Sequence, residues 1–99
     1  MNKTKCIWKY PLVITDHQVL TIPHGAKFLS AIEQEDLPTL YFIVNPKAVE
    51  GGSFQYLKIV MFGTGQPITN EELENLSFLG TVPTHNGILV WHIFKEGTL

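Results

Sequence analysis

Residues 78–94, FLGTVPTHNGILVWHIF, decide the fold more than any other stretch of this sequence. Asn86 and Gly87 are the strongest short signal for a β-hairpin, because a type I′ turn needs a positive φ at both central residues and these two residue types tolerate it best. The runs on both sides of this pair are rich in β-branched and aromatic residues, which favour strands. The run from Ile88 to Phe94 is apolar on both faces, so we expect it to be the central strand of the fold.

Two rows of side chains alternate along this last strand. We expect the row at positions 88, 90, 92 and 94 to face the core of the domain. The other row, Leu89, Trp91 and Ile93, then needs a cover of its own, which is either another sheet of the same domain or a second subunit. Of these two alternatives we prefer an oligomer interface.

Outward from this hairpin, the rest of the chain divides into short apolar runs separated by turn residues. Pro11 cannot donate to a strand ladder, so we expect the first strand to lie at a sheet edge or to end there. Strands are predicted at residues 6–13, 18–22, 26–34, 39–44, 54–62, 77–83 and 88–95.

The connecting segments predict little helix. Residues 47–53 contain two consecutive glycines and are predicted to be the most flexible loop. Thr69 and Glu72 fit a capping box, which favours a single helical turn over residues 69–76. The sequence therefore predicts an all-β domain with about seven antiparallel strands and at most one short helical turn. A sandwich and a small barrel remain open.

Composition limits the possible functions. The chain of 99 residues is long enough for one domain, spanning residues 1–99, and its charged fraction of 16% lies below the usual ~25%, which favours self-association. Seven lysines, no arginine and a net charge of −2 disfavour direct binding of nucleic acid. The single cysteine, Cys6, excludes a disulfide within the chain and suits a reducing compartment. No apolar run is long enough for a membrane helix or a signal-peptide core.

Two stretches are candidate ligand sites. Gly63, Thr64 and Gly65 follow a predicted strand, and consecutive backbone N–H groups there could hold a phosphate, with Lys58 or Lys9 nearby. The alternative is a turn that simply requires glycine, since the remaining residues of a phosphate-binding loop are missing.

Trp8, Lys9 and Tyr10 form the second candidate site. They combine aromatic rings with a cation, which suits stacking on a base beside a phosphate. The alternative is an edge strand with core aromatic side chains on one side and an exposed lysine on the other.

No residue pattern predicts catalysis, a cofactor or a metal. The chain has four histidines, but none are spaced as a ligand pair, and no cysteine or carboxylate cluster accompanies them. Cys6 lies among apolar neighbours, where a thiol is usually inert. We therefore expect a protein that is not an enzyme.

Five short motifs, in this order along the chain, resemble a known family. They are IWKYPL at residues 7–12, PxGAKFL at 23–29, GTGxPI at 63–68, FLGTV at 78–82 and LVWHIF at 89–94. Together they are similar to a family of small proteins of tailed bacteriophages and prophages, known as a domain of unknown function. The resemblance implies a phage origin and a small accessory protein in the host cytoplasm. It brings no catalytic residues to carry over.

Two hypotheses about function arise from this resemblance. The first is a non-enzymatic phage accessory protein, a homo-oligomer, that binds and neutralises a host factor by sequestering a nucleotide-type defence signal where residues 63–65 meet Trp8 and Lys9 at a subunit junction. The alternative is an inhibitor or adaptor that contacts a host protein through a strand edge or the Trp91 row. A minor structural component of the virion is a third possibility.

Overall fold

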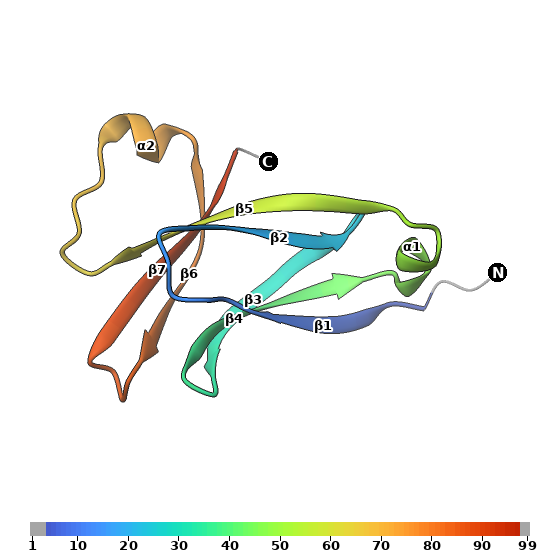
Figure 1. The fold of residues 1–99 in the computed structure, drawn as a ribbon, viewed down its shortest axis with the longest axis horizontal. Coiled ribbons are helices and arrows are strands. Elements are labelled where there is room, and N and C mark those ends of the chain that lie inside the picture. Colours follow the sequence, from blue (N-terminus) through green and yellow to red (C-terminus); the bar gives the residue numbers. More distant parts are fainter. Residues whose placement is uncertain (1–3, 98–99) are drawn as a thin grey trace.

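The computed structural model describes residues 4–97 and shows seven strands and two short helices in that part of the chain (Figure 1). The elements are β1 (Cys6–Pro11), β2 (His17–Pro23), β3 (Lys27–Gln34), β4 (Leu37–Val44), α1 (Pro46–Glu50), β5 (Phe54–Gly63), α2 (Asn70–Glu74), β6 (Leu76–Thr84) and β7 (Leu89–Glu96).

The strands form two antiparallel sheets packed as a sandwich. One sheet has the order β1-β4-β3 and the other has the order β2-β5-β7-β6. Every ladder in the described chain is antiparallel. The prediction of an all-β fold with about seven strands is confirmed, and of the two architectures left open the molecule is a sandwich. As expected from Pro11, β1 lies at a sheet edge, and β7 lies between β5 and β6 as an interior strand.

The core fills the space between the sheets. From Leu40 onward every second residue of β4 is buried there, with Leu40, Phe42 and Val44 at most 2% exposed. Met61 of β5 and Ile93 of β7 belong to the same cluster from the opposite sheet. This alternation is the period of two that an extended chain imposes on its side chains.

The two rows of side chains on β7 face the opposite way to the prediction: the row with Trp91 and Ile93 faces the core, and the row with His92 and Phe94 does not. Ile93 has no exposed surface, and Trp91 packs against the core cluster, so these two residues of the row expected to need a partner are covered by the other sheet of the same chain. Leu89, the third residue of that row, stays 40% exposed at the end of the strand. The row of His92 and Phe94 lies on the outer face instead, where Phe94 packs edge to face on Phe62 with ring centroids 5.8 Å apart. Both rows are apolar, so the sequence pattern alone could not choose between them.

The edge strands β3 and β6 meet along one side of the sandwich. A Cβ atom added at Gly80 would lie 2.9 Å from the Cβ of Ala31, closer than two such atoms can approach. Both strands carry a bulge just before this point, between Phe28 and Ser30 and between Phe78 and Gly80. Gly80 therefore allows the two sheet edges to approach each other.

The last hairpin has its turn at His85 and Asn86, one residue earlier than predicted, and its connecting loop is longer than the predicted two residues. Asn86 and Gly87 have positive φ as expected, but His85 also does, at 54°. The Gly87 N–H donates to the Thr84 carbonyl at 3.1 Å, and the strands end at Thr84 and Leu89. The connection thus has four residues, 85–88, and Ile88 is an exposed turn residue rather than the start of the strand.

Two helices form where at most one was expected. The loop predicted at residues 47–53 begins with α1, because the Asn45 side chain accepts from the Lys47 N–H at 3.1 Å and Pro46 occupies the first turn. An Asn-Pro pair is an N-cap signal as well as a strand terminator. The helical turn predicted from Thr69 and Glu72 is confirmed as α2, with both halves of the capping box present.

Candidate functional site

The glycine turn at residues 63–65 was predicted to bind an anion, but two of its backbone N–H groups donate hydrogen bonds within the chain. Gly65 has a φ of 91°, so the turn does require glycine there. The Gly63 N–H donates to Gln66 Oε1 at 3.0 Å, and the Thr64 N–H donates to the Val90 carbonyl at 3.2 Å. Two of the N–H groups expected to hold a phosphate therefore already have protein acceptors.

The Thr64 hydroxyl is also engaged. Its Oγ1 lies 2.8 Å from His92 Nε2, and Nδ1 of the same ring lies 3.0 Å from Thr81 Oγ1. The three side chains lie on the outer face of the four-stranded sheet, where Thr81 and His92 are cross-strand neighbours. A hydroxyl beside an imidazole can start a nucleophilic mechanism, but here both ring nitrogens are bonded to hydroxyls. This chain of contacts fixes the loop after β5 to the sheet.

The remaining residues of the predicted ligand site lie elsewhere in the molecule. Trp8 is on β1 of the other sheet and packs against the core. Figure 1 shows β1 and the loop that follows β5 at opposite ends of the long axis. Lys58 Nζ lies 3.7 Å from Glu96 Oε2 in an exposed ion pair. A single chain therefore does not bring the glycine turn, Trp8, Lys9 and Lys58 together.

A different group of residues is brought together where the β3–β4 and β6–β7 hairpins end. The two tips lie next to each other in Figure 1. Their residues line an open cavity of about 610 Å³. We call this the hairpin-tip surface; it comprises Glu33, Asp36, Pro83, Thr84, His85, Asn86, Gly87 and Ile88. Sequence reasoning missed it because the two tips are almost fifty residues apart in the chain.

The backbone of both tips is held in a conformation that is costly for most residues. In residues 4–97, the non-glycine residues with positive φ are Glu35, Asp36, His85 and Asn86, all of them in these two turns. Each such residue costs on the order of 1 kcal/mol, and the cost is least offset for glutamate, since asparagine, aspartate and histidine adopt this conformation more often. Backbone of this kind persists where surrounding contacts fix it, and it is often found at functional sites.

Asp36 supplies the contacts that join the tips. Its Oδ1 accepts from the His85 backbone N–H at 2.6 Å, and its Oδ2 lies 3.6 Å from His85 Nε2. The Asp36 N–H in turn donates to Glu33 Oε2 at 2.7 Å. A carboxylate that accepts a backbone N–H forms one of the stronger hydrogen bonds in proteins. The two hairpins are therefore fixed relative to each other at their ends.

A chain of side-chain contacts runs from this junction into the core. Trp91 Nε1 donates to Thr84 Oγ1 at 3.0 Å, which leaves the hydroxyl proton free to point at His85 Nδ1, 3.0 Å away. The order aspartate, histidine, hydroxyl resembles a catalytic triad in composition. However, Thr84 is only 2% exposed and already accepts from an indole, so a substrate cannot reach its oxygen. The arrangement orients His85 and stabilises the turn.

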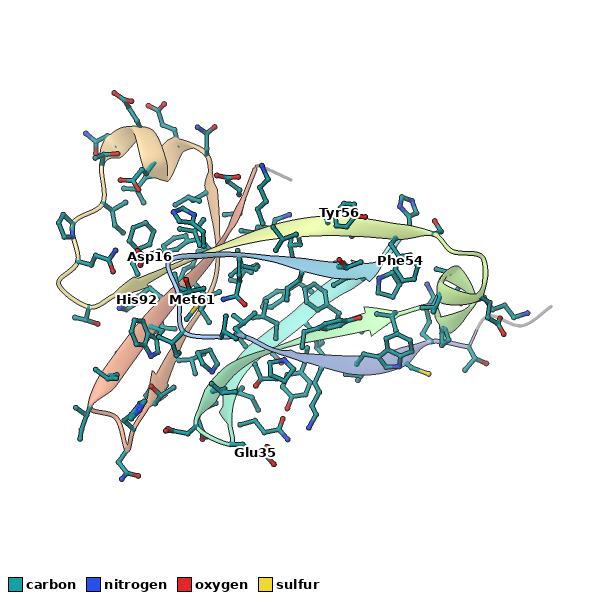
Figure 2. The ribbon with its side chains drawn as sticks, viewed as in Figure 1. Asp16, Glu35, Phe54, Tyr56, Met61 and His92 are labelled. Atoms are coloured by element: carbon teal, nitrogen blue, oxygen red, sulfur yellow. The ribbon has the colours of Figure 1, made fainter. Side chains whose placement is uncertain are left out.

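Exposed apolar side chains lie at the hairpin-tip surface and on the outer sheet face. Ile88 is 80% exposed at the rim of the hairpin-tip surface. Tyr56 and Phe78, 75% and 60% exposed, lie on the outer face of the four-stranded sheet, and Figure 2 shows Tyr56 pointing away from the sandwich. Phe78 packs edge to face on Phe94 with centroids 5.4 Å apart.

Two other kinds of feature are absent from the part of the chain that the structure describes. Within residues 4–97, no three histidine, cysteine, aspartate or glutamate side chains are placed to bind a metal ion together. None of the helices in that range has the length and apolar character needed to cross a membrane.

Comparison with known proteins places the chain in one family. The model of a family described as a domain of unknown function (DUF7352) matches residues 3–98. Neither the curated proteins nor the solved structures contain a significant match. The family match covers nearly the whole chain, and it brings no activity with it.

Proposed function

We propose that this chain, which belongs to the DUF7352 family of unknown function, is a non-enzymatic binding protein that contacts a partner protein through its hairpin-tip surface. The observation that supports this most is the junction between the tips, where Asp36 accepts a hydrogen bond from the His85 backbone N–H and lies close to the His85 ring. This is the second of the hypotheses from sequence, with a new surface assigned to it.

Preorganisation is the physical reason for this proposal. Binding loops that must be ordered on association lose affinity, because each immobilised group costs conformational entropy. The tips are ordered before binding by the Asp36 contacts and by the bond between Thr84 and Trp91. The four left-handed turn residues are stabilised by these contacts rather than by their own preferences.

The composition of the hairpin-tip surface suits a protein partner. Ile88 offers an exposed apolar side chain beside a concave surface, and Glu33, Asp36 and His85 supply polar groups around it. Protein interfaces combine apolar contact residues with polar groups of this kind. Loops at one end of a β-sandwich are a frequent place for such contacts.

The biological setting we propose is that of a phage accessory protein acting in the host cytoplasm by neutralising a host factor. This part rests on the sequence motifs that resemble phage proteins and on no feature of the fold. A minor structural role in the virion is a competing proposal. Mass spectrometry of purified particles separates the two, because an accessory protein will be absent from them.

Sequestration of a nucleotide-type signal remains a second proposal with a specific requirement. Since Gly63–Gly65 and Trp8 lie apart in one chain, a nucleotide that contacts both must lie between two copies. The specific observation in its favour is that Thr64 and Gly65 are exposed. A thermal-shift screen with cyclic and ADP-ribose-type nucleotides tests it, and the absence of any shift would exclude it.

The test of the main proposal compares variants of the full chain. We expect Ile88→Asp and Asp36→Ala to abolish the saturable capture of a partner from a lysate of the host, since the first removes the apolar anchor and the second releases the two tips. Tyr56→Asp is the matched control, because Tyr56 is almost as exposed as Ile88 but lies on the outer face of β5.

Three outcomes are informative. Loss of capture with both tip variants and its retention with Tyr56→Asp supports the proposal. Loss with Tyr56→Asp alone assigns the contact to the outer face of the sheet. Equal capture by all three variants contradicts a role of either surface.

A further inference from the structure

The side of the sandwich where β3 and β6 meet is closed in its middle and open at one end. Ala31 and Gly80 touch in the middle, and Asp36 and His85 join the strands at the tips. Toward the first residues of β3 and β6, on the other side of the two bulges, the two strand edges separate. A space of about 590 Å³ opens there between the sheets, within the range of small-molecule sites. We call it the mouth of the sandwich.

The floor of the mouth is apolar and continuous with the core. Ile22 and Phe42 are 1% and 2% exposed, and both reach its inner end. Phe28 and Leu79 line its sides, one from each edge strand. Phe28 packs edge to face on Phe42 with centroids 5.7 Å apart, so an aromatic wall leads from the surface to the core. Such a lining favours an aliphatic or aromatic body over a polar one.

The charged groups of the mouth are both positive. Lys27 and Lys95 are among its lining residues, and no aspartate or glutamate is. Lys95 follows buried Ile93 by two positions and is paired with Ile59, so it starts from the inner face of the sheet. Within residues 4–97 neither ammonium group forms an ion pair. Lys27, at the start of β3, pairs with Ile43, so its side chain starts from the outer face of the three-stranded sheet and reaches the mouth from its rim. An apolar space with one lysine inside it and another at its rim is complementary to a molecule with an anionic head and an apolar tail.

We propose that the mouth binds a free aliphatic carboxylate of the fatty-acid class. The acyl chain lies between Phe28 and Leu79 with its end toward Phe42, and the carboxylate lies between Lys27 and Lys95. This site is separate from the hairpin-tip surface and does not depend on the proposed protein partner.

The test is calorimetric titration of the whole chain with octanoate, decanoate and dodecanoate below their micellar concentrations. Burial of each added methylene raises the affinity by about fourfold, so decanoate, with two more methylenes, will bind about fifteenfold more tightly than octanoate. Decyltrimethylammonium has the same tail with a cationic head, and we expect no measurable binding of it.

Lysine variants locate the site. The double variant Lys27→Gln and Lys95→Gln will weaken decanoate binding by about tenfold or more, since charge-assisted hydrogen bonds are lost. The matched control is Lys9→Gln and Lys47→Gln, which removes the same charge at positions outside the mouth. These are surface substitutions with little effect on folding.

Three results would overturn the proposal. They are equal binding of decanoate and decyltrimethylammonium, an affinity independent of chain length, and equal weakening by the two double variants. The first indicates an unspecific apolar surface, the second indicates contact with the head group only, and the third indicates a general charge effect. Absence of any heat with dodecanoate at two well-separated temperatures would overturn it as well, because apolar burial that gives no heat at one temperature gives heat at another.

Discussion

Substituting Gly80 by alanine tests the contact that holds the two sheet edges together. The added Cβ would lie 2.9 Å from the Cβ of Ala31, so one of the strands must shift. Overpacking of this kind costs about 1–3 kcal/mol, while the loss of glycine's freedom in the unfolded chain returns about 0.4–1 kcal/mol. We therefore expect Gly80→Ala to lower the free energy of unfolding by about 1–2 kcal/mol.

The assay is urea denaturation followed by tryptophan fluorescence, and thermal unfolding checks it. For a domain of this size the melting temperature should fall by about 4–8 °C per kcal/mol. Gly63→Ala is the matched control. Its Cβ would meet the Trp91 ring at 3.5 Å, which is an ordinary contact, so we expect a change of at most about 0.5 kcal/mol.

A double-mutant cycle identifies the cause. Ala31→Gly alone costs about 1–2 kcal/mol, from a lost methyl contact and the greater freedom of glycine in the unfolded chain. Combined with Gly80→Ala it restores room for the new methyl group, so the double variant should be more stable than the sum of the single effects by about 1 kcal/mol or more. Additive effects, or a Gly80→Ala variant as stable as Gly63→Ala, would refute the close approach of β3 and β6.

Three further predictions concern other parts of the chain. Trp91→Lys will destabilise the fold by about 3 kcal/mol in urea, because Trp91 packs against the core; unchanged stability would contradict the observed orientation of β7. The backbone N–H and the hydroxyl of Thr69 lower the pKa of Glu72 from its usual value, so their stabilisation of α2 is present at neutral pH and lost as the pH falls through that lowered pKa. Amide exchange at α2 should rise in acid; Thr69→Ala should weaken this dependence, because the backbone N–H remains, and Glu72→Gln should remove it. Light scattering should give a mass above 11.2 kDa and Phe78→Ser should reduce it, whereas a wild-type mass of 11.2 kDa at micromolar concentration would exclude self-association.

Strand positions were predicted well from local pattern. The alternation in residues 26–34 predicted β3, although alanine and glutamate also suit helices. Asn45 and Pro46 were correctly placed after a strand, yet the same pair also caps a helix, and only the downstream hydrogen bonds distinguish the two uses. Local signals thus predicted the ends of strands better than the structure of the segments after them.

The faces of β7 show the limit of local pattern. Both of its rows are apolar, so the inner row is set by register with its neighbours. Ile93 pairs with Met61 on one side and Gly80 on the other, and the small Gly80 admits the opposite sheet at that level. Register is a long-range property, because a shift of one residue would exchange the two faces.

The candidate sites were harder to predict than the fold. The turn at residues 63–65 was recognised, but its acceptors Gln66 and Val90 were not foreseeable from spacing. The hairpin-tip surface joins Asp36 to His85 across two separate hairpins, and no local motif marks it. The positive φ of Glu35 and Asp36, in a turn without glycine, becomes visible only in the structure.

Site-specific photocrosslinking tests the proposed function most directly. A benzoylphenylalanine residue is placed at position 88 of the hairpin-tip surface in one variant and at position 56 in another, since both positions are highly exposed. We predict a single crosslinked partner protein in stoichiometric yield from position 88, lost when Asp36→Ala is added, and no such product from position 56. The same product from both positions, or a product from position 88 that survives Asp36→Ala unchanged, would contradict the assignment of the hairpin-tip surface as a preorganised binding site.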